Sequence, residues 1–158
     1  MKTNMRRGFT MIELIFVIVI IGILAAVAIP KLAATRDSAA AATCQHELGG
    51  LVQEIGAAYT SDGYTELIKR KWSDVSNISD NPDGNGFAKD TADKTISGKK
   101  SVDYNCGGTK LATLTISTGN LKVVPGPKSN DGTAAGIAWE KLSGAVFTKA
   151  GGERNFKL

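Results

Sequence analysis

The chain has 158 residues, of which 42% are hydrophobic and 22% are charged, and this length and composition fit one domain with an appendage. Its net charge of +4 falls to 4 − 3 = +1 when the three basic residues of positions 1–8 are set aside, so the charge gives little reason to expect nucleic-acid binding. Two cysteines, Cys44 and Cys106, and a single histidine, His46, cannot complete a tetrahedral zinc site without carboxylates or another chain, and no C-x-x-C redox pair is present.

The first predicted element is an apolar helix over residues 9–29. As an α-helix these 21 residues would be about 31 Å long, which matches the hydrocarbon core of a bilayer. Apolar side chains occupy every side of this helix, whereas a helix packed on the core of a soluble domain is apolar on one side. Membrane contact is therefore expected, although one carboxylate, Glu13, lies inside the run at a cost of about 2.5–3.5 kcal/mol on insertion scales.

Three explanations of the apolar run differ in what they imply for Glu13. A secretory signal peptide cut at the small residues 26–28 and a plain membrane anchor both leave this carboxylate without a partner, because the nearest cations lie before Gly8. A cut after Gly8 instead makes Phe9 the first residue, and its new α-amine has a reference pKa of about 8. In a stack of identical chains that amine could pair with Glu13 of a neighbour, so Glu13 would favour assembly over the lone subunit.

The stretch GFTMIE, residues 8–13, resembles the processing site of type IV prepilins and of type II secretion pseudopilins, and residues 21–30 continue the pattern. The resemblance implies that a membrane prepilin peptidase cuts between Gly8 and Phe9 and then N-methylates Phe9. It also implies that Glu13 takes part in methylation and sets the register between subunits during assembly. The implied partners are copies of the chain or related pilins in a helical filament, the peptidase, inner-membrane lipid and an assembly platform. No cofactor is implied.

Two residues are expected to weaken the apolar helix. Gly22 lacks a side chain and Pro30 removes a helical hydrogen bond, and the resemblance implies that the interval between them unwinds in assembled filaments.

Residues 31–60 are amphipathic and are predicted to form a stem helix. One apolar stripe at helical spacing is expected to pack on a small sheet, and it comprises Cys44, Leu48, Leu51, Val52, Ile55 and Tyr59.

The expected fold class is α+β, in which a long N-terminal helix, first hydrophobic and then amphipathic, packs against a small antiparallel sheet. The predicted parts are a leader peptide at 1–8, a transmembrane or filament-core helix at 9–30, the stem at 31–60 and a globular head at 61–158. The elements predicted for the head, after the long helix ends at 61–63, are a short helix within 65–72, a polar loop over 79–100, a hairpin of strands 111–116 and 121–124, a helix at 134–142, and strands at 145–148 and 155–158.

Two candidate features of the head involve cysteine and calcium chemistry. Cys44 and Cys106 could form a disulfide between the stem and the sheet if the head faces an oxidising compartment, and the alternative is two buried thiols. Asn81, Asp83 and Asn85 resemble the front of a calcium loop, because oxygen-bearing side chains alternate before a glycine. The acidic residue that closes such a loop is missing, so a solvated turn is favoured and no metal site is expected.

We therefore expect a type IV pilin, a structural subunit made as a single-pass inner-membrane precursor with its head in the periplasm and later incorporated in a pilus or pseudopilus. A pseudopilin of a type II secretion system is the alternative within the family, and it is less favoured because the head lacks a clear calcium loop. A membrane-anchored periplasmic binding module is the alternative of another class, and filament formation would exclude it. No enzyme is expected, since His46 has no cysteine or serine partner at a motif spacing.

Overall fold

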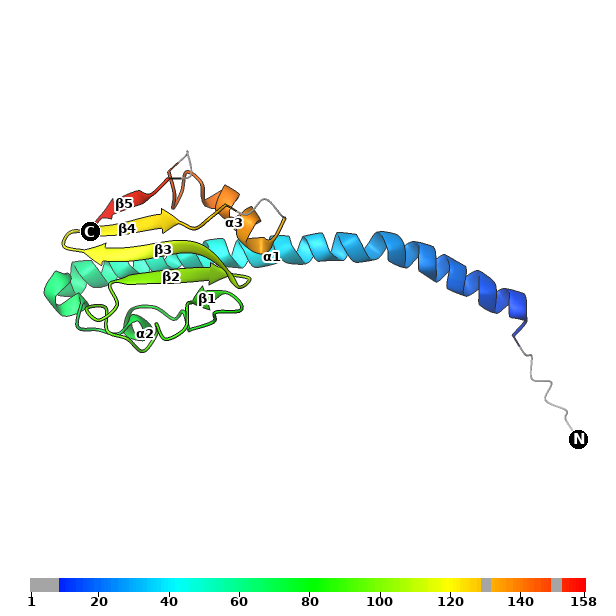
Figure 1. Ribbon diagram of the computed structural model, residues 1–158, viewed down its shortest axis with the longest axis horizontal. Helices are drawn as coiled ribbons and strands as arrows, with labels where there is room; N and C mark the ends of the chain where they lie inside the picture. Colours follow the sequence, from blue (N-terminus) through cyan, green and yellow to red (C-terminus); the bar gives the residue numbers. More distant parts are fainter. Residues whose placement is uncertain (1–8, 129–131, 149–151) are drawn as a thin grey trace, which may run out of the picture. The chain divides into compact units, whose positions relative to one another are not determined.

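The computed structural model describes residues 9–128, 132–148 and 152–158. A long helix, α1, is followed by two short helices and by five strands, which form one antiparallel sheet in the order β1-β2-β3-β4-β5 (Figure 1). This α+β arrangement confirms the fold class predicted from the sequence. The chain divides into two compact units, an N-terminal unit that ends at Arg36 and a head unit over Asp37–Leu158.

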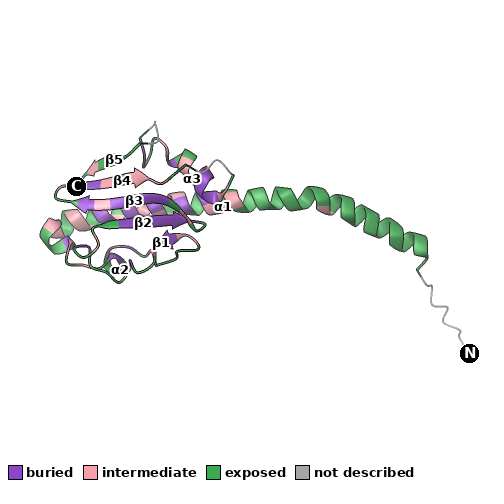
Figure 2. Cartoon of the chain, in the orientation of Figure 1, coloured by how far each residue is buried: buried purple, intermediate pink, exposed green. Residues whose placement is uncertain are grey.

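Helix α1 spans Met11–Leu67. In the N-terminal unit its surface is almost entirely exposed, and sixteen large apolar residues between Phe9 and Leu32 contribute to that surface (Figure 2). Helical φ and ψ angles continue through Gly22 and Pro30. The helix is therefore intact at both positions that were expected to weaken it, and unwinding there stays a prediction about the assembled filament.

In the head unit, one side of α1 is buried in the core. The predicted apolar stripe is confirmed, with Val52 and Tyr59 packing against the core while partly exposed. Residues at helical spacing form this buried side because they return to the same face of the helix every three or four positions. Its fully buried members are Ala41, Cys44, Leu48, Leu51 and Ile55, and the same core contains Val102, Tyr104, Leu111, Leu114, Ile116, Leu121 and Val123 from the sheet.

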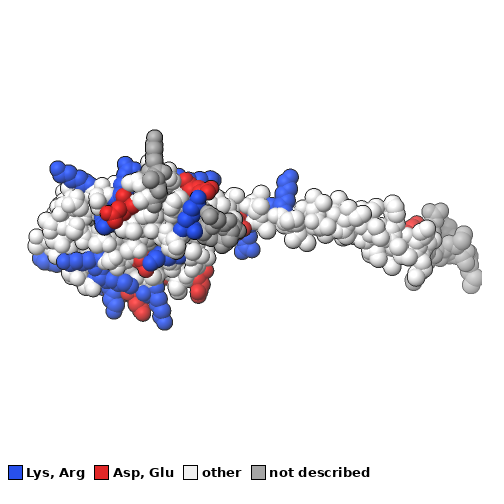
Figure 3. All heavy atoms as spheres, turned by 45° about the horizontal axis from the view of Figure 1, so that its top comes forward, with Lys and Arg blue, Asp and Glu red and all other residues white. Residues whose placement is uncertain are grey.

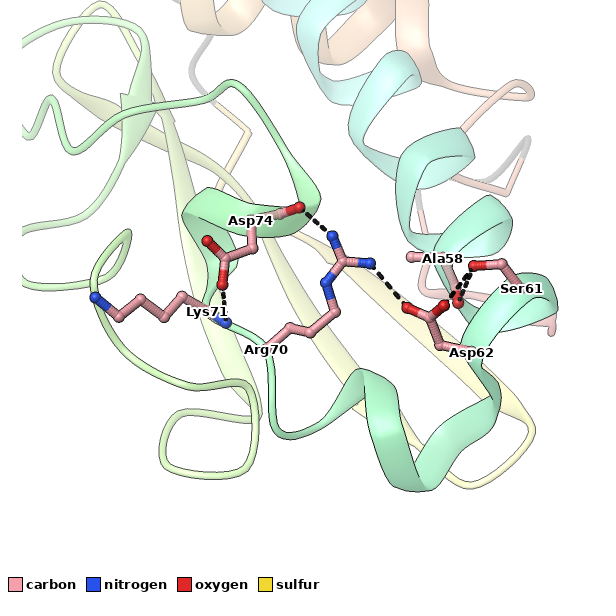
Figure 4. A network of polar contacts seen from close by, with 6 residues as sticks. All are labelled: Ala58, Ser61, Asp62, Arg70, Lys71 and Asp74. Carbon is pink, nitrogen blue, oxygen red and sulfur yellow. Dashed lines mark hydrogen bonds and ion pairs between the residues drawn. The ribbon is translucent and has the colours of Figure 1, made fainter.

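The regular part of helix α1 ends at Gly63, which is where the sequence predicted the end of the long helix. Gly63 has φ +70°, a left-handed conformation that glycine adopts without a steric penalty, and one further helical turn follows it. The guanidinium of Arg70 donates hydrogen bonds to Asp62 Oδ2 at 2.8 Å and to the carbonyl oxygen of Asp74 at 2.5 Å (Figure 4). Arg70 therefore connects the end of α1 with the four-residue helix α2, Trp72–Val75.

The sheet is antiparallel throughout, and each strand pairs with its neighbour in the chain. The predicted hairpin is confirmed and is closed by the pair Ser117 and Asn120. The predicted helix at 134–142 is also confirmed as α3, Ala134–Leu142, whose N-terminal cap is Thr133. The strands are β1 Gly86–Phe87, β2 Ser101–Cys106, β3 Thr109–Ser117, β4 Asn120–Pro125 and β5 Arg154–Lys157.

Several predictions for the head were wrong. The segment 101–106 is strand β2 although no strand was predicted there, and two residues of the predicted loop 79–100 form β1. The strand predicted at 145–148 is a turn, joined to Ser143 only by an isolated bridge from Phe147. The turn forms because Leu142, at the end of α3, has a carbonyl group without a helical partner, and this carbonyl accepts hydrogen bonds from the N–H groups that follow it.

Candidate functional site

The N-terminus of α1 is closed by reciprocal hydrogen bonds between Thr10 and Glu13. The backbone N–H and the hydroxyl of Thr10 both donate to Glu13 Oε2 at 2.8 Å, and the N–H of Glu13 lies 3.4 Å from the Thr10 hydroxyl oxygen. Such an arrangement is a capping box, which satisfies N–H groups that have no helical acceptor. No cation pairs with Glu13 among the described residues, but the hydrogen bonds from Thr10 were not predicted, although a Thr-x-x-Glu pattern before an apolar run indicates this motif.

The capping box is compatible with cleavage before Phe9. Gly8 lies outside the described residues, and Phe9 is 85% exposed. None of the bonds uses an atom of Phe9, so a cut between Gly8 and Phe9 would leave them in place. Within the described residues Glu13 Oε1 accepts no hydrogen bond, so one carboxylate oxygen holds the helix end while the other can accept a further donor.

The segment that follows is long and apolar enough to cross a membrane. Helix α1 contains a window of high hydropathy near the N-terminus in which no residue is buried, and charged side chains are sparse over this part of the helix (Figure 3). An added Cβ at Gly22 would meet no neighbouring atom. The exposed apolar side chains therefore require a contact outside their own unit, with lipid or with other helices.

In the head, a covalent bond and a hydrogen bond connect α1 with β2. Cys44 of α1 and Cys106 of β2 form a disulfide with a Cα–Cα distance of 5.8 Å, which confirms the predicted pairing. Beside it, the buried hydroxyl of Tyr104 donates to Glu47 Oε2 at 2.5 Å. Burial and the neighbouring carboxylate of Glu47 raise the pKa of Tyr104 well above its ordinary value, so the hydroxyl remains a donor at physiological pH.

The loop that contains the candidate calcium ligands Asn81, Asp83 and Asn85 packs against a turn of the sheet. The side-chain oxygen of Asn85 accepts the Gly107 N–H at 2.9 Å, and the carbonyl oxygen of Gly84 accepts the Gly108 N–H at 3.0 Å. These bonds hold the loop against the turn between β2 and β3. Asp83 is exposed, and among the described residues no group of three or more His, Cys, Asp or Glu side chains is placed to hold a metal ion.

A second candidate site, which the sequence did not predict, is a groove of about 280 Å³ in the head unit. One wall is the face of α1 that carries Glu47, Gly50 and Glu54, and the other is formed by residues 76–79 with Asn85. His46, which is exposed as predicted, lies at the same groove. The pattern that could have indicated the groove is the spacing of the two glutamates, since residues i and i+7 share one helix face.

Comparison with known proteins connects the N-terminal site to a family. Residues 3–29 match the prokaryotic N-terminal methylation motif, and this match includes the whole capping box and the apolar run. No curated protein and no solved structure shows significant similarity to the chain. The chain therefore carries, at its N-terminus, the methylation motif that is the signature of type IV pilins and pseudopilins.

Proposed function

We propose that this protein is a structural subunit of a type IV pilus-like filament. The precursor inserts in the inner membrane through residues 9–30, is cut between Gly8 and Phe9, is methylated on the Phe9 amine and polymerises through α1. The observation that carries the proposal is the methylation motif joined to a helix with an exposed apolar surface. Packing among other helices would replace burial in lipid, so transfer into a filament would not require exposure of this surface to water.

Glu13 has two separable tasks in this proposal. Its Oε2 atom accepts the Thr10 donors and closes the helix, whereas its Oε1 atom is available for the Phe9 amine of a neighbouring copy. An unpaired carboxylate in apolar surroundings is costly, and a positive partner relieves that cost. Assembly would thus be favoured over the lone subunit by the pairing of a charge that the subunit itself cannot neutralise.

Intact-mass measurement of the protein from its native membrane tests the processing step. We expect a chain that begins at Phe9 and carries one additional methyl group. A chain cut at residues 26–28 would show an ordinary signal peptide, and an uncut chain would show a plain anchor. Either result would remove the amine that the proposal pairs with Glu13, and the proposal would then be abandoned.

A pair of variants tests the assembly step. Glu13→Gln keeps a residue that is able to complete a capping box but removes the charge, whereas Thr10→Ala removes the cap and keeps the charge. We expect both variants to insert in the membrane, and we expect Glu13→Gln to reduce filament yield much more than Thr10→Ala does. Equal losses would mean that the carboxylate serves only the helix end.

A type II secretion pseudopilin shares the N-terminal features used above. We favour the pilin because a calcium loop that starts at Asn81 would be closed by an acid at position 92, which is Ala, and because the Asn85 oxygen already bonds the β2–β3 turn. Deletion of the gene should then remove surface filaments and leave protein secretion unchanged. Loss of secretion with no loss of surface filaments would instead assign the chain to a secretion system.

A further inference from the structure

We propose that the groove of the head is a subunit contact that receives the guanidinium of Arg36 from a second copy of the chain. The inference rests on the proposed function, because a filament places copies side by side. The contact lies outside the apolar helix core, and it gives a role to charged side chains that have no partner among the described residues.

The acidic side of this contact is Glu54. Its side chain is half-buried in the groove and makes no hydrogen bond or ion pair within the described residues. Positions three and four residues away on the same helix usually supply such a partner, but here they hold no cation: they are Gly50, Leu51, Ala57 and Ala58. A partly desolvated carboxylate without a cation is unfavourable, so a cation from another molecule would stabilise it.

The other groups at the groove favour a cation that donates several hydrogen bonds. Glu47 has one oxygen committed to Tyr104 and contributes a second negative charge. Asn77 adds an amide group on the opposite wall, where the side-chain oxygen of Asn85 already accepts the Gly107 N–H, and none of the described residues that line the groove is a lysine or an arginine. A planar guanidinium with five donors matches carboxylate and amide oxygens better than an ammonium group does.

Gly50 lines the groove without a side chain. Glycine inside a helix costs about 1 kcal/mol relative to alanine, and usually a positive φ or a close approach requires it. Gly50 shows neither, because its φ is not positive and an added Cβ would meet no atom within 4 Å. Gly49, which does not line the groove, has the same open surroundings, so what distinguishes Gly50 is its place in the groove wall, where a long side chain would occupy the space that a guanidinium needs.

Arg36 is the complementary group on a second copy. It is exposed and makes no ion pair or side-chain hydrogen bond within the described residues. The positions three and four residues away carry no acid: they are Leu32, Ala33, Ala39 and Ala40. Lys31 is also exposed and makes no ion pair within the described part of the chain, but it directly follows Pro30 at the end of the apolar run, where a long ammonium side chain suits the lipid headgroups.

The pairing sets a geometric requirement on the filament. Arg36 precedes Glu54 by 18 residues on α1 (54 − 36), and at about 1.5 Å per residue this separation is about 27 Å along a helix. Two parallel copies that form the contact must therefore be displaced by about 27 Å along the helix axis, with some tolerance from the long arginine side chain. A filament reconstruction can check this displacement directly.

A charge exchange in the full-length protein tests the contact itself. We expect Arg36→Glu and Glu54→Arg each to reduce the yield of sheared filaments at least about tenfold, because each change places like charges together. The double variant, Arg36→Glu with Glu54→Arg, should return to within about threefold of the wild-type yield, because the two positions are then coupled. Normal yields from both single variants, or a double variant no better than the worse single variant, would overturn the proposal.

Two glycine variants provide a matched control that does not alter either charge. Gly50→Lys would place an ammonium group inside the groove one turn before Glu54, and it should lower filament yield. Gly49→Lys adds the same charge at a position that also has open space but does not line the groove, and it should assemble normally. Equal yields from the two variants would show that the groove is not used in assembly.

The outcomes also separate this proposal from the proposed function. Each variant is checked by intact mass for cleavage before Phe9 and by thermal unfolding for an intact head. If wild-type protein is processed and forms filaments while the charge exchange has no effect, only the groove contact fails. If the wild type forms no filaments, the filament function fails, and the contact that rests on it is overturned as well.

Discussion

In the head unit, helix α1 lies under a five-stranded sheet, and side chains from both elements share one core. A disulfide and the bond between Tyr104 and Glu47 reinforce the same helix–sheet contact. The N-terminal unit contains the first part of the same helix, but there the apolar side chains are exposed. Its large apolar side chains between Phe9 and Leu32 are exposed, and the two cations in the described part of this unit, Lys31 and Arg36, have no ion-pair partner among the described residues.

This contrast indicates where each unit obtains its stability. The head buries its apolar groups within one chain, as an independent domain does. The N-terminal unit has a secure helix end, through Thr10 and Glu13, but no core. Its described apolar side chains need contacts outside the unit, which we propose to be lipid and other subunits, so changes in the two units should produce different defects. Changes in the head should alter unfolding of a single chain, and changes in the N-terminal unit should alter partitioning and assembly.

The largest expected effect follows from separating the two units. A fragment of residues 37–158 should be soluble and monomeric and should unfold cooperatively, because its core is complete without the N-terminal unit. The chain that begins at Phe9 should require detergent or lipid. Size-exclusion chromatography and urea unfolding of the fragment test this expectation. Aggregation, or the lack of a cooperative transition, would show that the head depends on the N-terminal unit and would remove the contrast.

The next largest effect concerns the disulfide of the head. Replacing Cys44 and Cys106 together by alanine should lower the free energy of unfolding by about 4 kcal/mol in the chain-entropy model, because the bonded residues are 62 positions apart. Urea unfolding of wild type and variant provides the measurement. A reductant should reproduce the loss in the wild type and leave the variant unchanged. A loss below about 1 kcal/mol would mean that packing alone holds helix and sheet together.

The sequence was informative wherever a local pattern determines the structure. The stripe on α1, the hairpin of β3 and β4 and helix α3 follow from hydrophobic period and turn residues, and these predictions were confirmed. Strand β2 was missed because Asp103 and Asn105, both unfavourable in strands, interrupt its apolar positions. Tertiary contacts compensate: Asp103 accepts a hydrogen bond from Thr113 on β3, and Asn105 donates to the carbonyl of Pro82.

The N-terminal site was predictable in part, and the groove was not. Residues 8–13 lie within the methylation motif that the family comparison matches, and the same stretch contains the signal for the capping box. The groove depends on residues 76–79 and Asn85 folding back on the helix. Such a contact between positions far apart in the sequence has no local pattern. Only the spacing of Glu47 and Glu54, which places both on one face of α1, indicated that this face is polar where it lines the groove.

A smaller effect within the head is expected from Tyr104→Phe. The change leaves one oxygen of the half-buried Glu47 without its donor, and an unsatisfied buried polar group costs about 1–3 kcal/mol. The free energy of unfolding at neutral pH measures this cost. Glu47→Gln is the control, because an amide oxygen can still accept the tyrosine hydroxyl. If Tyr104→Phe is neutral while Glu47→Gln destabilises, the bond is not the source of the stabilisation.

The same tyrosine gives a dependence on alkaline pH. The pKa of Tyr104 in the folded head is raised above the ordinary value of 10.0, first by burial and then by Glu47. Above pH 10 the unfolded chain therefore loses this proton before the folded chain does, and the head is progressively destabilised as pH rises. In Tyr104→Phe this contribution should disappear. An identical alkaline decline in wild type and variant would show that other groups cause it.

The smallest expected effect comes from the ion pair at the end of α1, where the Asp62 and Arg70 side chains are 29% and 38% exposed. The hydrogen bond from Arg70, followed by that from Ser61, lowers the pKa of the Asp62 carboxyl below its ordinary value of 3.8. The stabilisation is therefore present above that value and is lost as pH falls through the lower pKa of the folded state. Arg70→Gln should raise the pKa of Asp62, which a carboxyl NMR titration would show.

The same variant should change the unfolding midpoint of the head less than Tyr104→Phe does, because water screens an exposed ion pair. Arg70 also donates to the Asp74 carbonyl, so Asp62→Asn is needed to separate the ion pair from that second bond. If Asp62→Asn destabilises the head as much as loss of the Tyr104 bond, surface charges contribute more to the head than its burial pattern implies. The stability of the head would then depend substantially on surface charge as well as on its buried core, and the contrast with the N-terminal unit could not be explained by apolar burial alone.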